Sequence, residues 1–271
     1  MIEAVLAALF GLIFGSFLNV CIYRLPRDLS VVRPRSFCPA CEQPIAWYDN
    51  LPLISFLLLG GWCRHCRARI SLRYPVVELA TACFFFAAVW MHGLGLASLK
   101  LCVFAALLTG LTFTDLEERI LPDEFTLGGM AIGFVLSIFV PLESGLAFAF
   151  LGGTNPPAVS LGESVAGAGL GAGAIWMVGW LYEKIRRREG LGFGDVKMVG
   201  MIGAFLGLRQ TLLIVLLGSL AGSVGGTLYI ILGRKVPSQY PLPYGAFLGA
   251  AALFVAYFGW TVFGSVTNWR G

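Results

Sequence analysis

The sequence predicts an all-α polytopic membrane protein of about eight transmembrane helices, with a small cytoplasmic loop domain after the first helix. Hydrophobic residues fill 58% of its 271 positions and gather in long runs. Charged residues fill only 13%, about half the ~25% of soluble domains. The 35 glycines follow no collagen-like period and fit close packing between membrane helices. This composition excludes an ordinary soluble domain.

The apolar runs supply the predicted spans. Crossing ~30 Å of hydrocarbon takes about 17 to 25 mostly apolar residues. Seven stretches meet this length, and the shorter stretch 196–207 has the length of a half-span or a buried helix. The seven are 2–22, 75–92, 97–114, 124–142, 163–182, 209–232 and 244–264.

Charge indicates the topology. With the N-terminus outside and 196–207 crossing, 16 of the 19 lysine and arginine residues lie on the inner side, as cytoplasmic loops require. This bias favours eight spans over seven. The net charge of +4 is spread between apolar runs, so we expect contact with membrane lipid and none with nucleic acid. We place residues 143–162, which carry a glycine pair and a proline pair, in an outer loop.

We divide the chain into a first transmembrane helix (1–22), a cytoplasmic loop domain (23–74) and a transmembrane domain (75–271). Only 23–74 is long enough for a small domain between spans. Its stretch 51–62 is apolar but too short to span. We expect this stretch at the membrane surface or beneath the cysteines of the same loop.

Four of the seven cysteines form two tight pairs in that loop. Cys38 and Cys41 make one CxxC pair, and Cys63 and Cys66 make the other. Four thiolates from two such knuckles form the closed tetrahedral site that structural Zn²⁺ prefers. Persistent disulfides are disfavoured in a cytoplasmic loop. A redox pair, or thiols without a role, are the alternatives.

Two aspartates at the ends of apolar segments are candidate catalytic residues. Asp115 ends one predicted span and Asp195 opens the segment 196–207. The topology places both at the cytoplasmic end, where they could meet. Two close carboxylates in a low-dielectric site share one proton, as in aspartic proteases. Gly192 and Gly194 lack a Cβ atom and leave room for an extended substrate backbone.

Other interpretations of these residues remain open. Asp195 and Asp123 could each be the N-cap of the helix that follows, and Gly194 could permit a turn with positive φ. The carboxylates alone fit a proton-coupled transporter as well as a protease. A non-catalytic assembly factor that docks through the cysteine loop is a third possibility.

Taken together, the motifs resemble the type IV prepilin peptidases, membrane aspartic proteases of the GxGD class. The resemblance covers nearly the whole chain, because motifs occur from the first predicted span to residue 197. They are Gly15-Ser-Phe-Leu-Asn-Val with Arg24 and Pro26, the two cysteine knuckles, Ile70-Ser-Leu-Arg-Tyr-Pro with Glu78, Asp115 with Leu121-Pro-Asp123, and Gly192-Phe-Gly-Asp-Val-Lys197.

The resemblance implies an activity. Such enzymes cut the basic leader from type IV prepilins or type II secretion pseudopilins, after a glycine, on the cytoplasmic side of the bacterial inner membrane. Many then N-methylate the new N-terminus with S-adenosylmethionine, and the cysteine loop is associated with these bifunctional members. Asp115 and Asp195 match the catalytic pair of the family.

Two features of the resemblance bear on further residues. No residue that binds the methyl donor can be identified from the sequence. Arg73 and Glu78 are candidates, or they form a structural ion pair. Tyr244-Gly245-Ala246 departs from the Phe-Gly-Pro of many members, and we expect this departure to leave the aspartates untouched.

Overall fold

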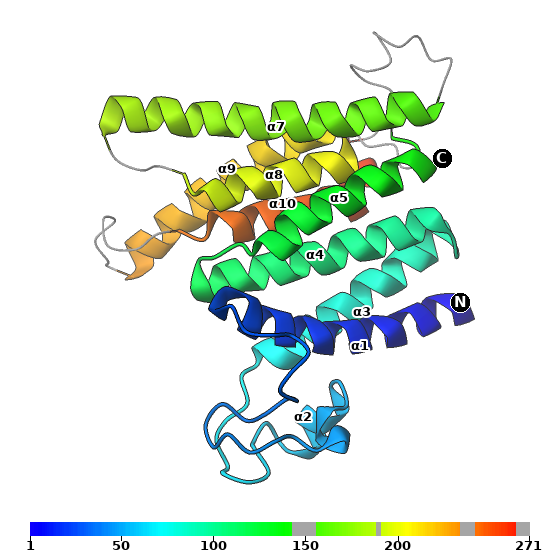
Figure 1. Cartoon of the computed structure of the whole chain (residues 1–271), viewed down its shortest axis with the longest axis vertical. Coiled ribbons are helices and arrows are strands. Elements are labelled where there is room, and N and C mark those ends of the chain that lie inside the picture. The colour runs from blue at the N-terminus through cyan, green and yellow to red at the C-terminus, as the bar shows by residue number, and fades with distance from the viewer. Residues whose placement is uncertain (143–155, 188–190, 234–241, 264–271) are drawn as a thin grey trace. The chain divides into compact units, whose positions relative to one another are not determined.

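The computed structural model describes residues 1–142, 156–187, 191–233 and 242–263. Within these ranges the all-α expectation is confirmed, because they contain helices and only two isolated β-bridges (Figure 1). The elements, in chain order, are α1 (Ile2–Arg24), the 3₁₀ turns η1 (Leu25–Arg27) and η2 (Trp47–Asn50), α2 (Ile54–Leu58), α3 (Arg73–His92), α4 (Leu96–Glu118), α5 (Asp123–Phe139), α7 (Pro156–Arg186), α8 (Phe193–Leu206), α9 (Leu208–Gly233) and α10 (Tyr244–Phe263).

Five helices of the described ranges are long and apolar enough to cross a membrane: α1, α3, α4, α7 and α9. Each of the eight predicted apolar segments forms a helix, but the count of about eight crossings stays a prediction. The predicted outer loop is wrong over 156–162, because α7 already begins at Pro156. Proline is compatible with a helix start, where its missing N–H has no intrahelical partner. Residues 143–155 lie outside the described ranges.

Helix α8 is surrounded by protein. Its 14 residues extend about 21 Å, less than the ~30 Å of a hydrocarbon core. All nine residues from Met198 to Leu206 are buried, and α5, α7, α9 and α10 pack around the helix. The apolar composition of 196–207 therefore reflects contact with other helices.

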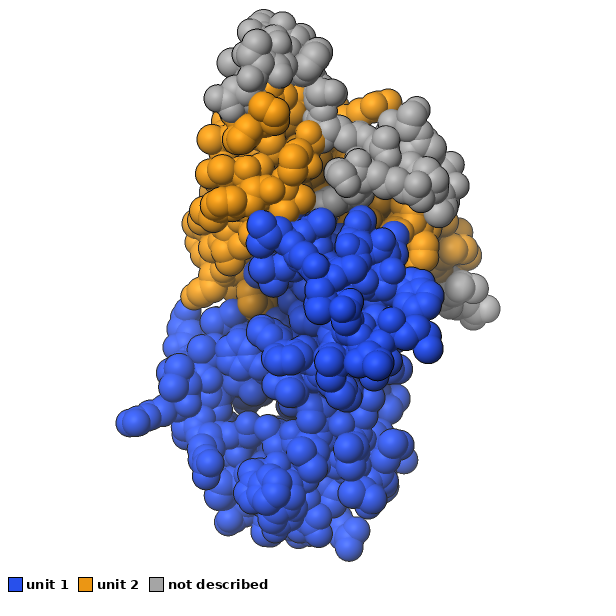
Figure 2. Space-filling view, turned by 90° about the vertical axis from the view of Figure 1, so that its right-hand side faces the viewer, with its two compact units in different colours: residues 1–110 blue, residues 111–271 orange. Residues whose placement is uncertain are grey.

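The chain divides into two compact units, Met1–Gly110 and Leu111–Gly271, coloured separately in Figure 2. In the first unit, α1 packs closely on α3. A Cβ atom on Gly15 would lie 2.7 Å from Glu78 Cα, and one on Gly11 would lie 2.7 Å from Ala82 Cα. Small residues allow such backbone contact between membrane helices.

Candidate active site and metal centre

The second unit positions Asp115 in the last turn of α4. The helix continues to Glu118, three residues beyond Asp115. The Asp115 side chain is buried, with only 6% of the residue exposed. Arg119 follows the helix in a left-handed conformation, and its backbone N–H and its guanidinium both donate to the Asp115 carbonyl oxygen. The end of α4 is thereby fixed, and with it the place of the carboxylate.

Asp195 is the third residue of α8. The helix begins at Phe193 with Gly192 as its N-cap, so the prediction that Asp195 is the N-cap is wrong. Asp123 does not cap α5 either, because that cap is Pro122. The Asp123 carboxylate instead accepts two hydrogen bonds from Lys197 Nζ, at 2.7 and 2.9 Å.

Asp115 and Asp195 belong to one site. The charge of Asp115 acts on the Asp195 carboxyl, which is half-buried. Leu121 lies against both sides of this site. A Cβ atom on Gly194 would lie 3.2 Å from Leu121 Cβ, and one on Gly245 would lie 3.1 Å from Leu121 Cδ1 and 3.2 Å from Asp115 Oδ2. The role of the two aspartates as a catalytic pair stays a prediction.

The start of α10 takes part in the site, which the sequence analysis missed. The Ala246 N–H donates to Asp115 Oδ2 at 2.8 Å. The expectation that Tyr244-Gly245-Ala246 leaves the aspartates untouched is therefore wrong. Tyr244 lies close enough for the charge of Asp195 to act on it, and its hydroxyl hydrogen-bonds Ser219 Oγ at 2.9 Å. In the sequence, the difference between these three residues and the Phe-Gly-Pro of many family members was the sign that this segment belongs to the site.

The two glycines before Asp195 differ in their surroundings. In the Cβ direction of Gly192, Asp195 Oδ2 at 3.3 Å is the single described atom within 4 Å. The same direction at Gly194 is occupied by the Leu121 side chain. A positive φ does not explain Gly194, since the described glycines with positive φ are elsewhere, at Gly60, Gly61, Gly93 and Gly207.

The four predicted cysteine ligands come together in the first unit. The Sγ atoms of Cys38, Cys41, Cys63 and Cys66 all lie within 4.8 Å of one another. The two knuckles are built alike. In one, Cys38 N donates to the Gln43 carbonyl at 3.0 Å; in the other, Cys63 N donates to the Ala68 carbonyl at 2.8 Å. An antiparallel bridge closes each, Phe37 with Pro44 and Trp62 with Arg69.

This cluster fits a zinc ion. Tetrahedral Zn–S bonds of about 2.3 Å place sulfur atoms about 3.8 Å apart, and Cys38 Sγ lies 3.9 Å from Cys66 Sγ. A Zn²⁺ ion would bind these four ligands as thiolates. Four sulfur ligands leave no open position, so the metal would hold the loop together.

Glu78, a candidate from the resemblance, joins this loop to α3. Its Oε2 accepts the backbone N–H of Leu53 at 2.8 Å, and its carboxylate also accepts from the Ser16 hydroxyl. Arg73 stacks over the ring of Tyr74, with its guanidinium carbon 4.6 Å from the ring centroid. The Glu78 contacts show an anchoring role for this carboxylate in the described structure.

These features define a polytopic helical membrane protein with a pair of aspartates, one buried and one half-buried, in one unit and a four-cysteine cluster in the other. Comparison with known sequences then gives the family. The model of the type IV leader peptidase family matches residues 102–227, and that of the bacterial peptidase A24 N-terminal domain matches residues 9–92. The chain belongs to the type IV leader peptidase family.

Similar proteins cover nearly the whole chain. A prepilin leader peptidase/N-methyltransferase of Aeromonas hydrophila is 36% identical over 97% of this chain and 92% of its own length. One of Pseudomonas aeruginosa is 32% identical over 93% and 89%, and one of Myxococcus xanthus is 40% identical over 86% and 65%. No solved structure is significantly similar to this chain.

Proposed function

We propose that this chain is a prepilin leader peptidase that also N-methylates the new N-terminus of its product. The names of the similar proteins support both activities. The observation that carries the peptidase proposal is the aspartate site, where the charge of Asp115 from α4 acts on the Asp195 carboxyl of α8. Substrates of this activity are type IV prepilins or type II secretion pseudopilins.

The aspartates divide the chemistry of peptide hydrolysis between them. Two neighbouring carboxyl groups in a poorly solvated site hold one proton in common. The ionised carboxylate takes a proton from water, which attacks the scissile carbonyl carbon, while the protonated partner donates its proton to the carbonyl oxygen. The open side of Gly192, next to Asp195, is the place we assign to the substrate backbone.

The site faces the cytoplasm in this proposal, and the N-terminus of the chain lies outside. The distribution of lysine and arginine supports this orientation. A prepilin joins a basic leader to an apolar helix, so its scissile bond lies where the bilayer meets the cytoplasm. The protein then acts in the bacterial inner membrane, with residues 23–74 as a cytoplasmic domain between its first span and the peptidase domain 75–271.

Zinc and a methyl donor are the proposed cofactors. The four sulfur atoms of Cys38, Cys41, Cys63 and Cys66 would hold a structural zinc ion. S-adenosylmethionine would supply the methyl group, and we assign no residue to its binding. The polar contacts of Glu78 with Leu53 and Ser16 are explained without a cofactor.

The proposal is tested with the full chain in proteoliposomes, a prepilin, S-adenosylmethionine and mass spectrometry of the pilin N-terminus. We expect Asp115→Asn and Asp195→Asn each to lower the cleavage rate by about 100- to 10,000-fold, the range contributed by acid–base groups. Methylation is read in the same spectrum as a mass gain on the cleaved product.

Asp123→Asn is the matched control. Asp123 is a third aspartate of the same unit, but its carboxylate binds Lys197 in an ion pair that is 56% exposed on the Asp123 side. Exposed ion pairs contribute at most about 1 kcal/mol, so this variant should keep its rate within about tenfold. Normal cleavage by Asp115→Asn or Asp195→Asn would remove that residue from the mechanism.

A further inference from the structure

An exposed apolar surface lies on the short helix α2 of the cysteine-bearing loop. Ile54, Leu57 and Leu58 are spaced three and four residues apart, on one side of a helix, and are 54%, 76% and 81% exposed. We call these three residues the α2 patch. Ser55, between them in sequence, is buried instead. Clustered apolar side chains in contact with water are unfavourable, so such a surface usually has a partner.

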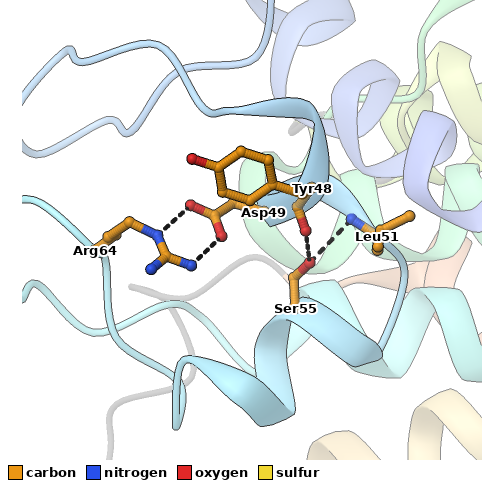
Figure 3. A network of polar contacts seen from close by, with 5 residues as sticks. All are labelled: Tyr48, Asp49, Leu51, Ser55 and Arg64. Carbon is orange, nitrogen blue, oxygen red and sulfur yellow. Dashed lines mark hydrogen bonds and ion pairs between the residues drawn. The ribbon is translucent and has the colours of Figure 1, made fainter.

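The loop holds α2 in a defined orientation, as Figure 3 shows. Ser55 Oγ accepts the backbone N–H of Leu51 at 3.0 Å and donates to the Tyr48 carbonyl at 2.9 Å. Arg64 donates two hydrogen bonds to Asp49, at 2.7 and 2.6 Å, and holds the pKa of that carboxyl below its usual value. The buried side of α2 is thus fixed by polar contacts, which leaves the α2 patch pointing outward.

The depth of α2 along the membrane helices indicates the partner. Leu53, the residue before α2, donates its N–H to Glu78 of α3. The backbone of Glu78 packs on Gly15 of α1. Gly15 lies nine residues before Arg24, the last residue of α1, which places it about 13 Å from that end of the helix along the helix axis. Because α1 and α3 are both long and apolar enough to span, α2 begins beside the spans, short of the end of α1.

Charge around the patch favours a negatively charged partner. Residues 23–74 contain eight arginines, no lysine and three acidic residues. Arg67 and Arg69 are exposed on the second knuckle, and the Arg69 guanidinium lies 5.2 Å from the ring centroid of Trp62. Aromatic and basic residues next to an apolar surface are typical of the bilayer interface.

We propose that the α2 patch inserts into the lipid leaflet at which α1 ends and α3 begins, and that the neighbouring arginines bind anionic phospholipid headgroups there. The cysteine-bearing loop is then a membrane-attached module, held by Glu78 from the side of the protein and by lipid from the side of the bilayer. Of the two positions expected for residues 51–62, at the membrane surface or beneath the cysteines, the proposal selects the membrane surface.

Site-specific photo-cross-linking tests the proposal. The full chain is reconstituted in vesicles of phosphatidylethanolamine and phosphatidylglycerol (3:1), with benzoylphenylalanine in place of Leu58. The matched control carries the same probe in place of Gln43, an exposed polar residue of the first knuckle. After irradiation, we expect at least tenfold more phospholipid adducts by mass spectrometry at position 58 than at position 43.

Each other outcome overturns the proposal. Equal adduct yields at both positions would mean that the patch has no preferred contact with lipid. Cross-links from position 58 to peptides of residues 111–271 would show that the patch packs on the rest of the chain. A yield that is the same in pure phosphatidylcholine vesicles and insensitive to salt would overturn the assigned role of the arginines, since their attraction to anionic lipid is screened by salt.

Discussion

The Asp115 carboxylate takes a hydrogen bond from a backbone N–H group, that of Ala246. Ala246 is the third residue of α10, and the first N–H groups of a helix have no intrahelical acceptor four residues back. They also lie at the positive end of the helix dipole. Both effects stabilise the ionised form of Asp115. The start of α10 therefore acts on the aspartate pair without contributing a charged side chain.

Substitution by proline deletes this donor. Many family members carry proline at this position, and the first helical turn tolerates proline, so we expect Ala246→Pro to insert and fold and to lower the cleavage rate by no more than about tenfold. Tenfold corresponds to about 1.4 kcal/mol, slightly less than the ~1.5–3 kcal/mol of a hydrogen bond to a charged group. Steady-state cleavage of a prepilin measures the effect. Ala246→Gly keeps the N–H and serves as the control, and equal rates for the two variants would show that the bond is dispensable.

Residue types reveal some parts of the site and conceal others. The four cysteines and the two aspartates were predicted from residue type and spacing. Thiolates are reactive and a carboxylate within a membrane span has a high free-energy cost, so both residue types usually indicate a function in such places. Ala246 could not be predicted in this way, since a backbone donor leaves no mark on the residue type. The N-caps were predicted wrongly at Asp195 and Asp123. The helix with Asp195 begins three residues earlier than expected, at Phe193, and the helix with Asp123 begins one residue earlier, at Asp123 itself.

At the scale of helices, α7 and α8 cross in backbone contact. A Cβ atom on Gly167 would lie 2.6 Å from the Gly203 carbonyl oxygen, and one on Gly203 would overlap the Gly167 backbone. The Ser164 hydroxyl, one turn earlier in α7, donates to the Ala204 carbonyl at 2.6 Å. Because Asp195 lies in the first turn of α8, this crossing helps to fix where the second aspartate lies.

Adding one methyl group at this crossing should separate the helices. We expect Gly203→Ala to lower stability by about 1–3 kcal/mol, the usual cost of overpacking, and to reduce cleavage through displacement of α8. Thermal unfolding in detergent and the cleavage rate are the two measurements. Gly169→Ala makes the same chemical change in α7 at a position where no atom of the described residues lies within 4 Å of the added Cβ, so a similar loss in both variants would contradict the close-contact explanation.

The helices were more predictable than their membrane crossings. Apolar runs located the eight longer helices of the described ranges, because burial in lipid or in protein selects the same side chains. For the same reason they do not decide whether α8 crosses, since its residues are covered by other helices. The start of α7 was missed because the proline pair was interpreted as a loop, although proline suits the first turn of a helix.

For the whole molecule, the two candidate centres belong to different units. Both aspartates, Leu121 and the start of α10 lie within Leu111–Gly271, whereas all four cysteine ligands lie within Met1–Gly110. The resemblance associates the cysteine loop with family members that also methylate. We infer that the two proposed activities respond differently to loss of the metal.

Replacing Cys38 and Cys63 together tests this division. Each knuckle loses a ligand, so the chain should fall from about one zinc per molecule to none. Cleavage should remain within about fivefold, because the aspartate site keeps all of its contacts, while methylation should fall at least tenfold. Metal analysis and mass spectrometry of the pilin N-terminus measure both effects.

Cys83→Ser is the control for that experiment, because Cys83 is an exposed cysteine of α3 outside the cluster. It should leave the zinc content and both activities unchanged. Absence of zinc from the freshly reduced, unsubstituted protein would remove the metal from the proposal. If cleavage and methylation fell equally in the double variant, the loop would support the whole enzyme. A role in methyl transfer alone would leave the positions of Asp115 and Asp195, and therefore the cleavage rate, unchanged.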